Sequence, residues 1–260
     1  NMFLLNTTRF IRILLISVVV ISPYKLFSKN IDLNYEIEWN TLNIAKLIWS
    51  ANFDDNRYII KNSILSDGFF NSLYPFELIS QTNGMVVDNS FLPNNFNYIS
   101  QSRKKNKSVS INFNEIGLIK DYKITPKPDD FYIDIFNQLS SDKPFTDPIS
   151  QLFEYFLYQK SSNKTIIDGR RIYDLHAENI DGKIFDKISS INFKGKALGL
   201  KITFPYYLSL WKDSKDDKNN IKYVIIYYSE FKNTNIPVQI VLKNNRSKIF
   251  MNLSSYNIVN

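Results

Sequence analysis

DPISQLFEYFLYQK, residues 147–160, is the stretch that decides the fold, because it is the one segment with a clear helical pattern in a sequence that otherwise favours strands. Asp147 is a favourable N-cap, and Pro148 suits the first helical position, where its missing N–H costs nothing. Apolar residues then recur at helical spacing on one face: Ile149, Leu152, Phe153, Phe156 and Leu157. An apolar face of this kind must be covered, so we predict a helix that packs against a sheet.

Strand patterns surround this segment on both sides. Residues 33–39 alternate apolar and polar side chains, and the same period of two recurs over residues 45–53 and 58–64. This alternation is typical of half-buried antiparallel strands in a meander. The whole sequence contains roughly eleven such stretches by pattern. We therefore predict a mainly β fold: a single curved antiparallel sheet, or half-barrel, with one central helix, residues 147–160, packed on its concave face.

Turn signals divide the predicted strands. Asn83-Gly84, Asp168-Gly169 and Asp181-Gly182 are dipeptides that tolerate positive φ, so we expect a tight turn at each. Residues 125–147 contain Pro126 and Pro128 and are predicted to be the longest irregular connection.

The N-terminal residues have the pattern of an export signal. Arg9 and Arg12 precede the largely apolar run 13–21, and Ser28 offers a small residue at a cleavage site. The run is far shorter than the roughly 20 residues that span a bilayer. We predict a secretory signal peptide over residues 1–28, a single mature domain over residues 29–260 and a periplasmic location. An uncleaved amphipathic anchor and a core segment are the alternatives.

Composition limits the partners of the protein. The net charge is +7, and removal of residues 1–28 would take away three positive charges and leave +4. This mild excess lacks the concentrated basic surface of a nucleic-acid binder, so no nucleic acid is expected. The chain has no cysteine, which excludes disulfides and thiol chemistry. One basic cluster, formed by Arg103, Lys104, Lys105 and Lys107, is predicted to be a solvated hairpin tip, with peripheral membrane contact as the alternative.

Motifs of several common enzyme classes are missing from the sequence, among them a Gly-rich phosphate loop, G-x-S-x-G and H-E-x-x-H. The single histidine, His176, stands between Asp174 and Glu178 at a spacing that would place all three on one face of a strand. An exposed polar strand face explains this pattern without chemistry, and a metal or acid–base cluster is the alternative. We expect no enzymatic activity, no cofactor and no metal site.

Aromatic residues are the candidate lining of an apolar cavity between sheet and helix. These residues are Trp39, Trp49, Phe153 and Phe156. They would bind a ligand only if their side chains leave space between them. Otherwise they fill the core, which is the commoner role of large aromatic side chains.

The order of these features resembles the exported family DUF3108, whose function is unknown. The matching stretches are a Tyr-x-(Ile/Val)-x-Trp strand at residues 35–39, a D-x-(Ile/Leu)-S helix start at 147–150, a G-(Lys/Arg)-x-(Ile/Tyr) strand at 169–173 and a closing Pro-Val at 237–238. The resemblance covers nearly all of residues 31–255, although this chain has few glycines and long tips rich in Asn and Lys.

The resemblance implies a half-barrel similar to those of periplasmic lipoprotein and lipid carriers. It therefore implies binding of a lipid or another apolar envelope molecule between sheet and helix. The alternative is a non-enzymatic assembly or scaffolding protein that binds envelope proteins through exposed strand edges.

Overall fold

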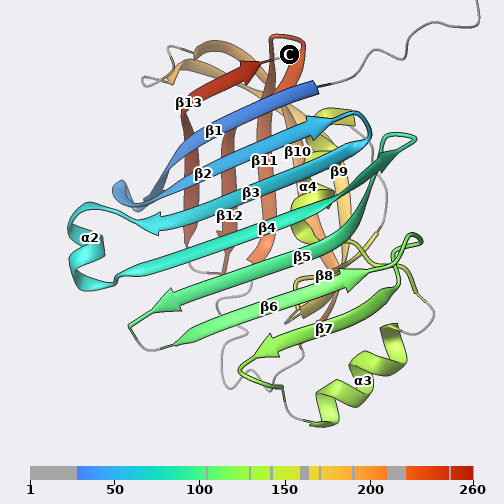
Figure 1. Ribbon diagram of the computed structural model, residues 1–260. Coiled ribbons are helices and arrows are strands. Elements are labelled where there is room, and N and C mark those ends of the chain that lie inside the picture. Colours follow the sequence, from blue (N-terminus) through green and yellow to red (C-terminus); the bar gives the residue numbers. More distant parts are fainter. Residues whose placement is uncertain are drawn as a thin grey trace, which may run out of the picture.

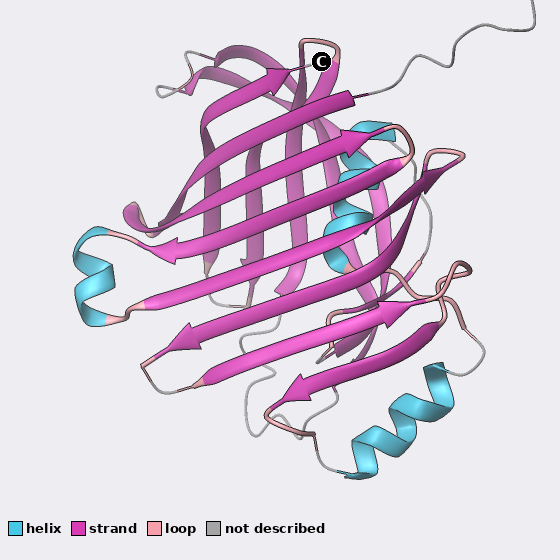
Figure 2. Cartoon of the chain, in the orientation of Figure 1, coloured by secondary structure: helices cyan, strands magenta, loops and turns pink. Residues whose placement is uncertain are grey.

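A computed structural model describes residues 28–103, 105–128, 130–140, 143–158, 164–169, 171–188, 191, 193–209, 221–245 and 247–259. In these residues the chain forms one antiparallel sheet of thirteen strands with three helices (Figures 1 and 2). The expected mainly β fold is confirmed, with thirteen strands where about eleven were predicted. The predicted signal peptide lies outside the described residues except for Ser28, the first residue of the sheet. No helix in the described ranges combines the length and the apolar content needed to cross a bilayer.

The sheet consists of two meanders that follow each other along the chain. The first contains β1 (Ser28–Trp39), β2 (Leu42–Asp54), β3 (Arg57–Ser66), β4 (Phe76–Val87), β5 (Ser90–Ser102), β6 (Asn106–Phe113) and β7 (Ile119–Thr125). The second contains β8 (Thr165–Ile167), β9 (Arg171–Ile188), β10 (Phe193–Ser209), β11 (Ile221–Phe231), β12 (Thr234–Asn244) and β13 (Lys248–Val259). Pairing of β1 with β13 joins them, so the strand order runs from β7 through β1 and β13 to β8.

Alternating burial explains how the first meander forms. Leu33, Tyr35 and Ile37 of β1 are buried, while the residues between them are partly exposed. The predicted alternation over residues 33–39, 45–53 and 58–64 therefore corresponds to β1, β2 and β3. Their inward side chains form one continuous core with those of the second meander.

Two of the three predicted turns are wrong. Asn83-Gly84 lies inside β4 at a bulge, and the chain turns instead at Asp88 and Asn89, which both have positive φ. A Cβ on Gly84 would lie 2.7 Å from the Tyr58 hydroxyl and 2.8 Å from the Pro93 Cα, so the glycine permits close approach of backbones within the sheet.

Asp181-Gly182 is likewise internal to a strand, β9, where a Cβ on Gly182 would collide with the Ala197 carbonyl of β10. Only Asp168-Gly169 forms the predicted turn, between β8 and β9, and Gly169 has a φ of +79°. A glycine that follows Asp or Asn in this chain therefore meets one of two structural requirements, a positive φ or a close approach of neighbouring backbones.

The chain contains more helix than the single one predicted. Helix α4 (Pro148–Tyr158) confirms the central prediction, and residues 159–160 lie outside the described part. Two helices were not predicted: α2 (Gly68–Leu73), between β3 and β4, and α3 (Asp130–Ser140), within the supposedly irregular connection. α3 packs against the sheet through Phe136, whose ring lies 4.5 Å from that of Tyr122 on β7. Pro126 and Pro128 indicate an irregular connection, whereas the eleven residues from Asp130 to Ser140 form a helix.

Helix α4 lies on the inner side of the curved sheet, between the first meander and the second (Figure 1). It contacts β4 and β5 on one side and β8 and β12 on the other. The helix therefore fills much of the space that the sheet encloses.

The two ends of the sheet meet without pairing as strands. We call the line where they meet the seam. Residues 143–147, which lead into α4, lie along it: the Phe145 N–H donates to the Gly117 carbonyl (2.8 Å), and Thr146 exchanges backbone hydrogen bonds with the β8 region (3.0 and 3.1 Å). In addition, Gly169 of the β8–β9 turn packs directly on Val109 of β6. A short linking segment and one glycine contact thus close a sheet that is open in its strand pairing.

Gly169→Ala tests this contact. The new methyl group would collide with the Val109 side chain at a positive φ, so we expect the free energy of unfolding to fall by at least about 2 kcal/mol. Val109→Ala in the same chain should recover at least about 1 kcal/mol of that loss as a coupling energy in urea unfolding. Purely additive effects would mean that the two ends of the sheet do not touch here.

Candidate functional site

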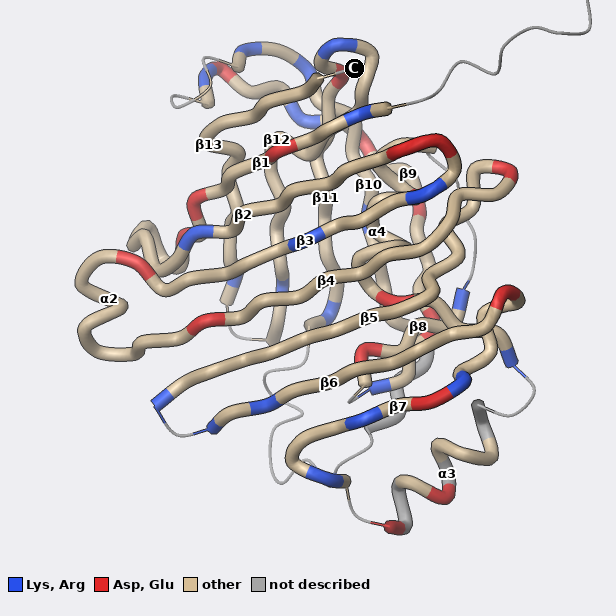
Figure 3. The backbone as a smooth tube through the Cα atoms, in the orientation of Figure 1, with Lys and Arg blue, Asp and Glu red and all other residues tan. Residues whose placement is uncertain are grey.

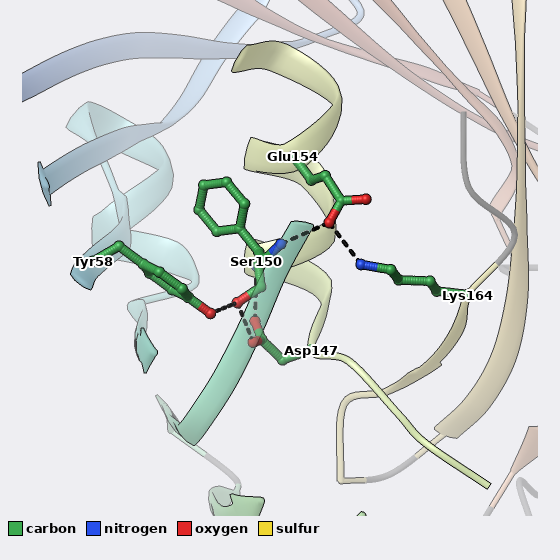
Figure 4. A network of polar contacts seen from close by, with 6 residues as sticks. Tyr58, Asp147, Ser150, Glu154 and Lys164 are labelled. Carbon is green, nitrogen blue, oxygen red and sulfur yellow. Dashed lines mark hydrogen bonds and ion pairs between the residues drawn. The ribbon is translucent and has the colours of Figure 1, made fainter. Parts of the chain in front are cut away.

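The start of α4 is fixed by a buried carboxylate (Figure 4). Oδ1 of Asp147 accepts the backbone N–H groups of Ile149 (2.9 Å) and Ser150 (3.0 Å), which is the N-cap predicted from the sequence. Oδ2 accepts the hydroxyls of Thr82 on β4 (2.8 Å) and of Ser150 (2.5 Å). The side chain that starts the helix therefore also binds it to the sheet.

Tyr58 extends this network to β3. Its hydroxyl lies 2.7 Å from Oγ of Ser150, and both side chains are buried. Burial raises the pKa of Tyr58 well above its ordinary value, and the neighbouring charge of Asp147 adds to the increase. Burial also raises the pKa of Asp147, although its hydrogen bonds to Ser150, Thr82 and Ile149 oppose that increase.

A second carboxylate fixes α4 two turns further on. Oε2 of Glu154 accepts the backbone N–H of Phe91 on β5 (2.8 Å) and the ammonium group of Lys164 (2.6 Å), as Figure 4 shows. The Glu154 side chain is fully buried and that of Lys164 is 25% exposed. Asp147 and Glu154 are seven positions apart and so lie on the same face of the helix. This face is held against β3, β4 and β5 at both ends.

A pocket of about 670 Å³ lies along the seam beside this network. It is within the range of about 300–1,000 Å³ that is usual for small-molecule sites. We call it the seam pocket. Both ends of the sheet and the linking segment line it: Phe91, Leu92, Ile116, Gly117, Lys143, Pro144, Phe145, Thr146, Lys164, Thr165, Asp174, Leu175, His176 and Pro205.

Most of the seam pocket is apolar, and its polar groups are few. Asp174 accepts the Thr165 hydroxyl (2.5 Å) and lies 3.7 Å from the Lys143 ammonium group. Oγ1 of Thr146 is buried and, within the described residues, has no hydrogen-bond partner. Since buried hydroxyls are normally paired, this atom and the Lys164 ammonium group are the candidate contacts for a polar part of a ligand.

A second and smaller space, the inner slot, lies between α4 and the sheet. It has a volume of about 220 Å³, and its walls are almost entirely apolar, with Trp49, Leu152 and Leu175 among them. This volume is below the usual range for ligand sites. The space in which a ligand was expected is therefore mostly filled, and the larger pocket lies at the seam.

The predicted aromatic residues do not line one cavity together. Trp49, Phe153 and Phe156 form a buried cluster with ring centroids 5.7 to 5.9 Å apart. Of these, Trp49 borders the inner slot. Trp39 lies apart at the end of β1, six positions from the residue that pairs with Trp49, and is 40% exposed. Three of the four residues thus serve chiefly as core.

His176 and Asp174 line the seam pocket from β9. Glu178 instead pairs with Lys201 at 2.6 Å, and that neighbour lowers the pKa of the Glu178 carboxyl. Nowhere in the described ranges do three or more His, Asp or Glu side chains form a cluster that could hold a metal ion. Asp174, His176 and Glu178 therefore lie on one face of β9 but make separate contacts.

The basic cluster lies at the turn between β5 and β6, as predicted for a hairpin tip. Lys104 is outside the described residues, whereas Arg103 donates to the Ser72 carbonyl of α2 at 2.9 Å. The cluster is far along the sheet from the residues of the seam pocket. It therefore belongs to a different surface.

Comparison with known proteins identifies the family of the chain. The family model "Protein of unknown function (DUF3108)" matches residues 34–246, which confirms the predicted resemblance. Comparison with curated proteins gave no match. Among solved structures, a β-barrel-like protein of the domain of unknown function DUF1849 from Brucella abortus is similar at a TM-score of 0.49 and 10% identity, over 90% of this chain and 100% of that one.

Substitution of Asp147 separates capping from charge. Asp147→Ala removes the N-cap and leaves buried hydroxyls unpaired, so we expect a loss of about 2 to 4 kcal/mol in the free energy of unfolding. Asp147→Asn keeps an oxygen for the two backbone N–H groups and should cost less. Equal losses in urea unfolding would contradict the capping role.

The pH dependence follows from the raised pKa of Asp147. A raised pKa means that the folded protein binds the carboxyl proton of Asp147 more tightly than the unfolded chain does. The contribution of Asp147 to stability therefore falls as the pH rises above 3.8, the ordinary pKa of an aspartate side chain. The free energy of unfolding of the wild type, measured relative to Asp147→Asn, should therefore decrease from about pH 4 upward. If the free energy of unfolding of the wild type instead increased with pH relative to Asp147→Asn, the pKa of Asp147 would not be raised in the folded protein.

Proposed function

Because the chain belongs to the DUF3108 family, whose function is unknown, we propose a role from its own geometry: it binds a lipid or a similar amphipathic molecule in the seam pocket. The protein then acts as a non-enzymatic binding protein of the periplasm, built as a half-barrel around α4. The observation that carries this proposal is a pocket of ligand size with apolar walls and a small polar group at one side.

The composition of the walls supports an amphipathic ligand. Phe91, Leu92, Phe145 and Leu175 offer apolar surface to a hydrocarbon part. The Lys164 ammonium group has three N–H donors, of which Glu154 accepts one. The remaining donors and the Thr146 hydroxyl suit a ligand group that accepts hydrogen bonds, such as a carboxylate, phosphate or ester.

Rigid support of the pocket is a further argument. Glu154 holds both Phe91 and Lys164, which are lining residues, and the carboxylate is itself fixed by the buried face of α4. A wall that is already in place spares the ligand the cost of ordering it. Helix α4 thus serves the pocket as a support behind its lining.

The periplasmic location rests on the N-terminal sequence. Arg9, Arg12 and the apolar run 13–21 favour export, and a chain without cysteine needs no particular redox environment.

Scaffolding through strand edges is less well supported. One edge strand, β7, carries Lys120, Asp121 and Lys123 in a stretch of seven residues, and charges of this kind oppose strand addition. The other edge strand, β8, has three residues, and Thr146 of the linking segment lies beside it. β7 and β8 are therefore poor templates for a partner strand. The edge that remains is the part of β9 beyond β8, and its first residues line the seam pocket.

His176→Trp tests the proposed site. This residue is exposed on β9 and lines the seam pocket, so an indole there would occupy the pocket without disturbing the core. We expect affinity for dansyl-aminoundecanoic acid, followed by fluorescence titration, to fall by at least roughly tenfold. Lipid extracted from the purified protein and identified by mass spectrometry should decrease in parallel.

Ile184→Trp is the matched control, because it introduces the same side chain at an exposed position of the same strand outside the pocket. Its affinity should equal that of the wild type. A wild-type protein that neither retains lipid nor takes up the dansyl probe would overturn the proposed function.

A further inference from the structure

We propose that the protein docks on anionic lipid bilayers through one end of the first meander, where exposed aromatic side chains stand beside the basic hairpin tip. This proposal is independent of the ligand in the seam pocket. It assigns a membrane-contact surface to α2 and to the turns on either side of it.

Topology gathers these residues at one end. In an antiparallel meander alternate turns lie at opposite ends of the sheet, so the β1–β2 turn, the β3–β4 connection with α2 and the β5–β6 turn share one end (Figure 1). We call it the aromatic end. The β2–β3, β4–β5 and β6–β7 turns share the other, which we call the acidic end.

The aromatic end exposes large apolar side chains that the fold does not use. Phe69 of α2 is 79% exposed and Tyr74, directly after α2, is 65% exposed, and the six residues of this helix include none that is buried. Trp39 and Leu42 of the β1–β2 turn are exposed as well. Leu73 is four positions after Phe69 and lies on the same side of the helix. Core packing therefore does not account for this helix.

The balance of charge differs between the two ends, because the β5–β6 tip is basic and the turns of the other end are mostly acidic (Figure 3). Arg103 donates to the carbonyl of Ser72, so the basic hairpin is attached to α2, and Lys105 and Lys107 follow it. The acidic residues at this end are Glu38 beside Trp39, Asp67, which is paired with Lys46 at 2.9 Å, and Glu77 at the start of β4.

The turns of the acidic end carry the opposite charge. Their acidic residues, Asp54, Asp55, Asp88 and Glu115, outnumber the one basic residue beside them, Arg57. An anionic surface would attract the first end and repel the second, which orients the protein before contact.

A bilayer fits this end better than a protein partner does. The exposed residues project from separate tips, α2 and the β1–β2 turn. An open hollow of about 600 Å³ between α2, β4 and the β5–β6 turn is lined by other residues, Asn71 and Arg103 among them, so the exposed aromatic side chains stand outside it. Tryptophan and tyrosine are enriched where membranes meet water, because their rings have an apolar body and a polar group. Neighbouring lysine and arginine side chains add attraction to anionic head groups.

Docking in this way leaves the seam pocket accessible. Phe91 and Leu92 follow the β4–β5 turn, and Ile116 and Gly117 belong to the β6–β7 turn, so this side of the pocket lies at the acidic end. The bound bilayer and the proposed ligand site are at opposite ends of the first meander.

The absence of cysteine in the full chain permits a direct test. Phe69→Cys and, as the matched control, Asn56→Cys each provide one thiol for the fluorophore NBD, at the aromatic end and in the exposed β2–β3 turn of the acidic end respectively. On addition of vesicles of phosphatidylglycerol and phosphatidylcholine, the NBD at position 69 should shift to the blue, brighten and be quenched by nitroxide-labelled lipid. The NBD at position 56 should remain unchanged.

Because each fluorophore reports only its own position, insertion of the N-terminal apolar run alone would leave the NBD at position 69 unchanged and would overturn the proposal. Capture of a protein without any response to vesicles would overturn it too.

Charge reversal supplies the second arm. A triple variant of the basic tip, with Arg103→Glu, Lys105→Glu and Lys107→Glu, should bind vesicles at least roughly tenfold more weakly. A control variant on β7, with Lys120→Glu and Lys123→Glu, should bind as the wild type does. Circular dichroism verifies that each variant is folded. Equal binding of all variants to pure phosphatidylcholine and to anionic vesicles would exclude an anionic surface as the partner. Retention of the dansyl probe in each variant would show that the ligand site is unaffected.

Discussion

Burial of the two carboxylates on α4 is the constraint on which the rest of the structure depends. A buried carboxylate is tolerated only when hydrogen-bond donors or cations surround it, and its desolvation otherwise costs several kcal/mol. Here the donors come from four places: Thr82 of β4 and Ser150 of α4 itself for Asp147, and the Phe91 N–H of β5 and Lys164 beside β8 for Glu154. The contacts with Thr82, Phe91 and Lys164 fix the rotation and the height of α4 within the sheet, because a small displacement would leave a carboxylate without its partners.

Local patterns predicted those parts of the fold that local physics determines. The N-cap Asp147 was predicted correctly, because a cap acts within a few positions. The predicted apolar face of α4 does pack on the core through Ile149, Phe153 and Phe156. Burial of Gln151 and Glu154 was not predicted, because it depends on polar partners in the sheet and not on the helical period. The inward residues of β1 to β3 were predicted from their alternation, because that period also acts within a few positions. The turns predicted at Asn83-Gly84 and Asp181-Gly182 were wrong. Glycine is needed there because the backbone of the facing strand comes close, at Leu92 and at Ala197 respectively. A neighbour in space leaves no mark in the local sequence.

The candidate site was predictable only in part. Proximity of Trp49 to Phe153 and Phe156 agrees with the predicted sheet–helix interface, but the three rings occupy the space between the elements. Size and shape of a cavity depend on packing, which no periodicity encodes. The seam pocket combines side chains from the start of β5, the β6–β7 turn, the linking segment and β9. Nothing in the sequence marks Thr146 or Lys164 except that each lies beside a predicted helix or strand.

The way in which the sheet closes explains why a pocket lies at the seam. Strands that pair along their whole length leave no room between them, because adjacent strands lie about 4.8 Å apart. At the seam, by contrast, β8 is only three residues long, and a single parallel bridge, between Thr146 and Ile166, links it to the preceding segment. Beyond that bridge, residues of β9 and of the β6–β7 turn line the two sides of the seam pocket. Closure by a linking segment in place of a strand therefore leaves a space, and the Glu154 contacts hold Phe91 and Lys164 in position in its wall.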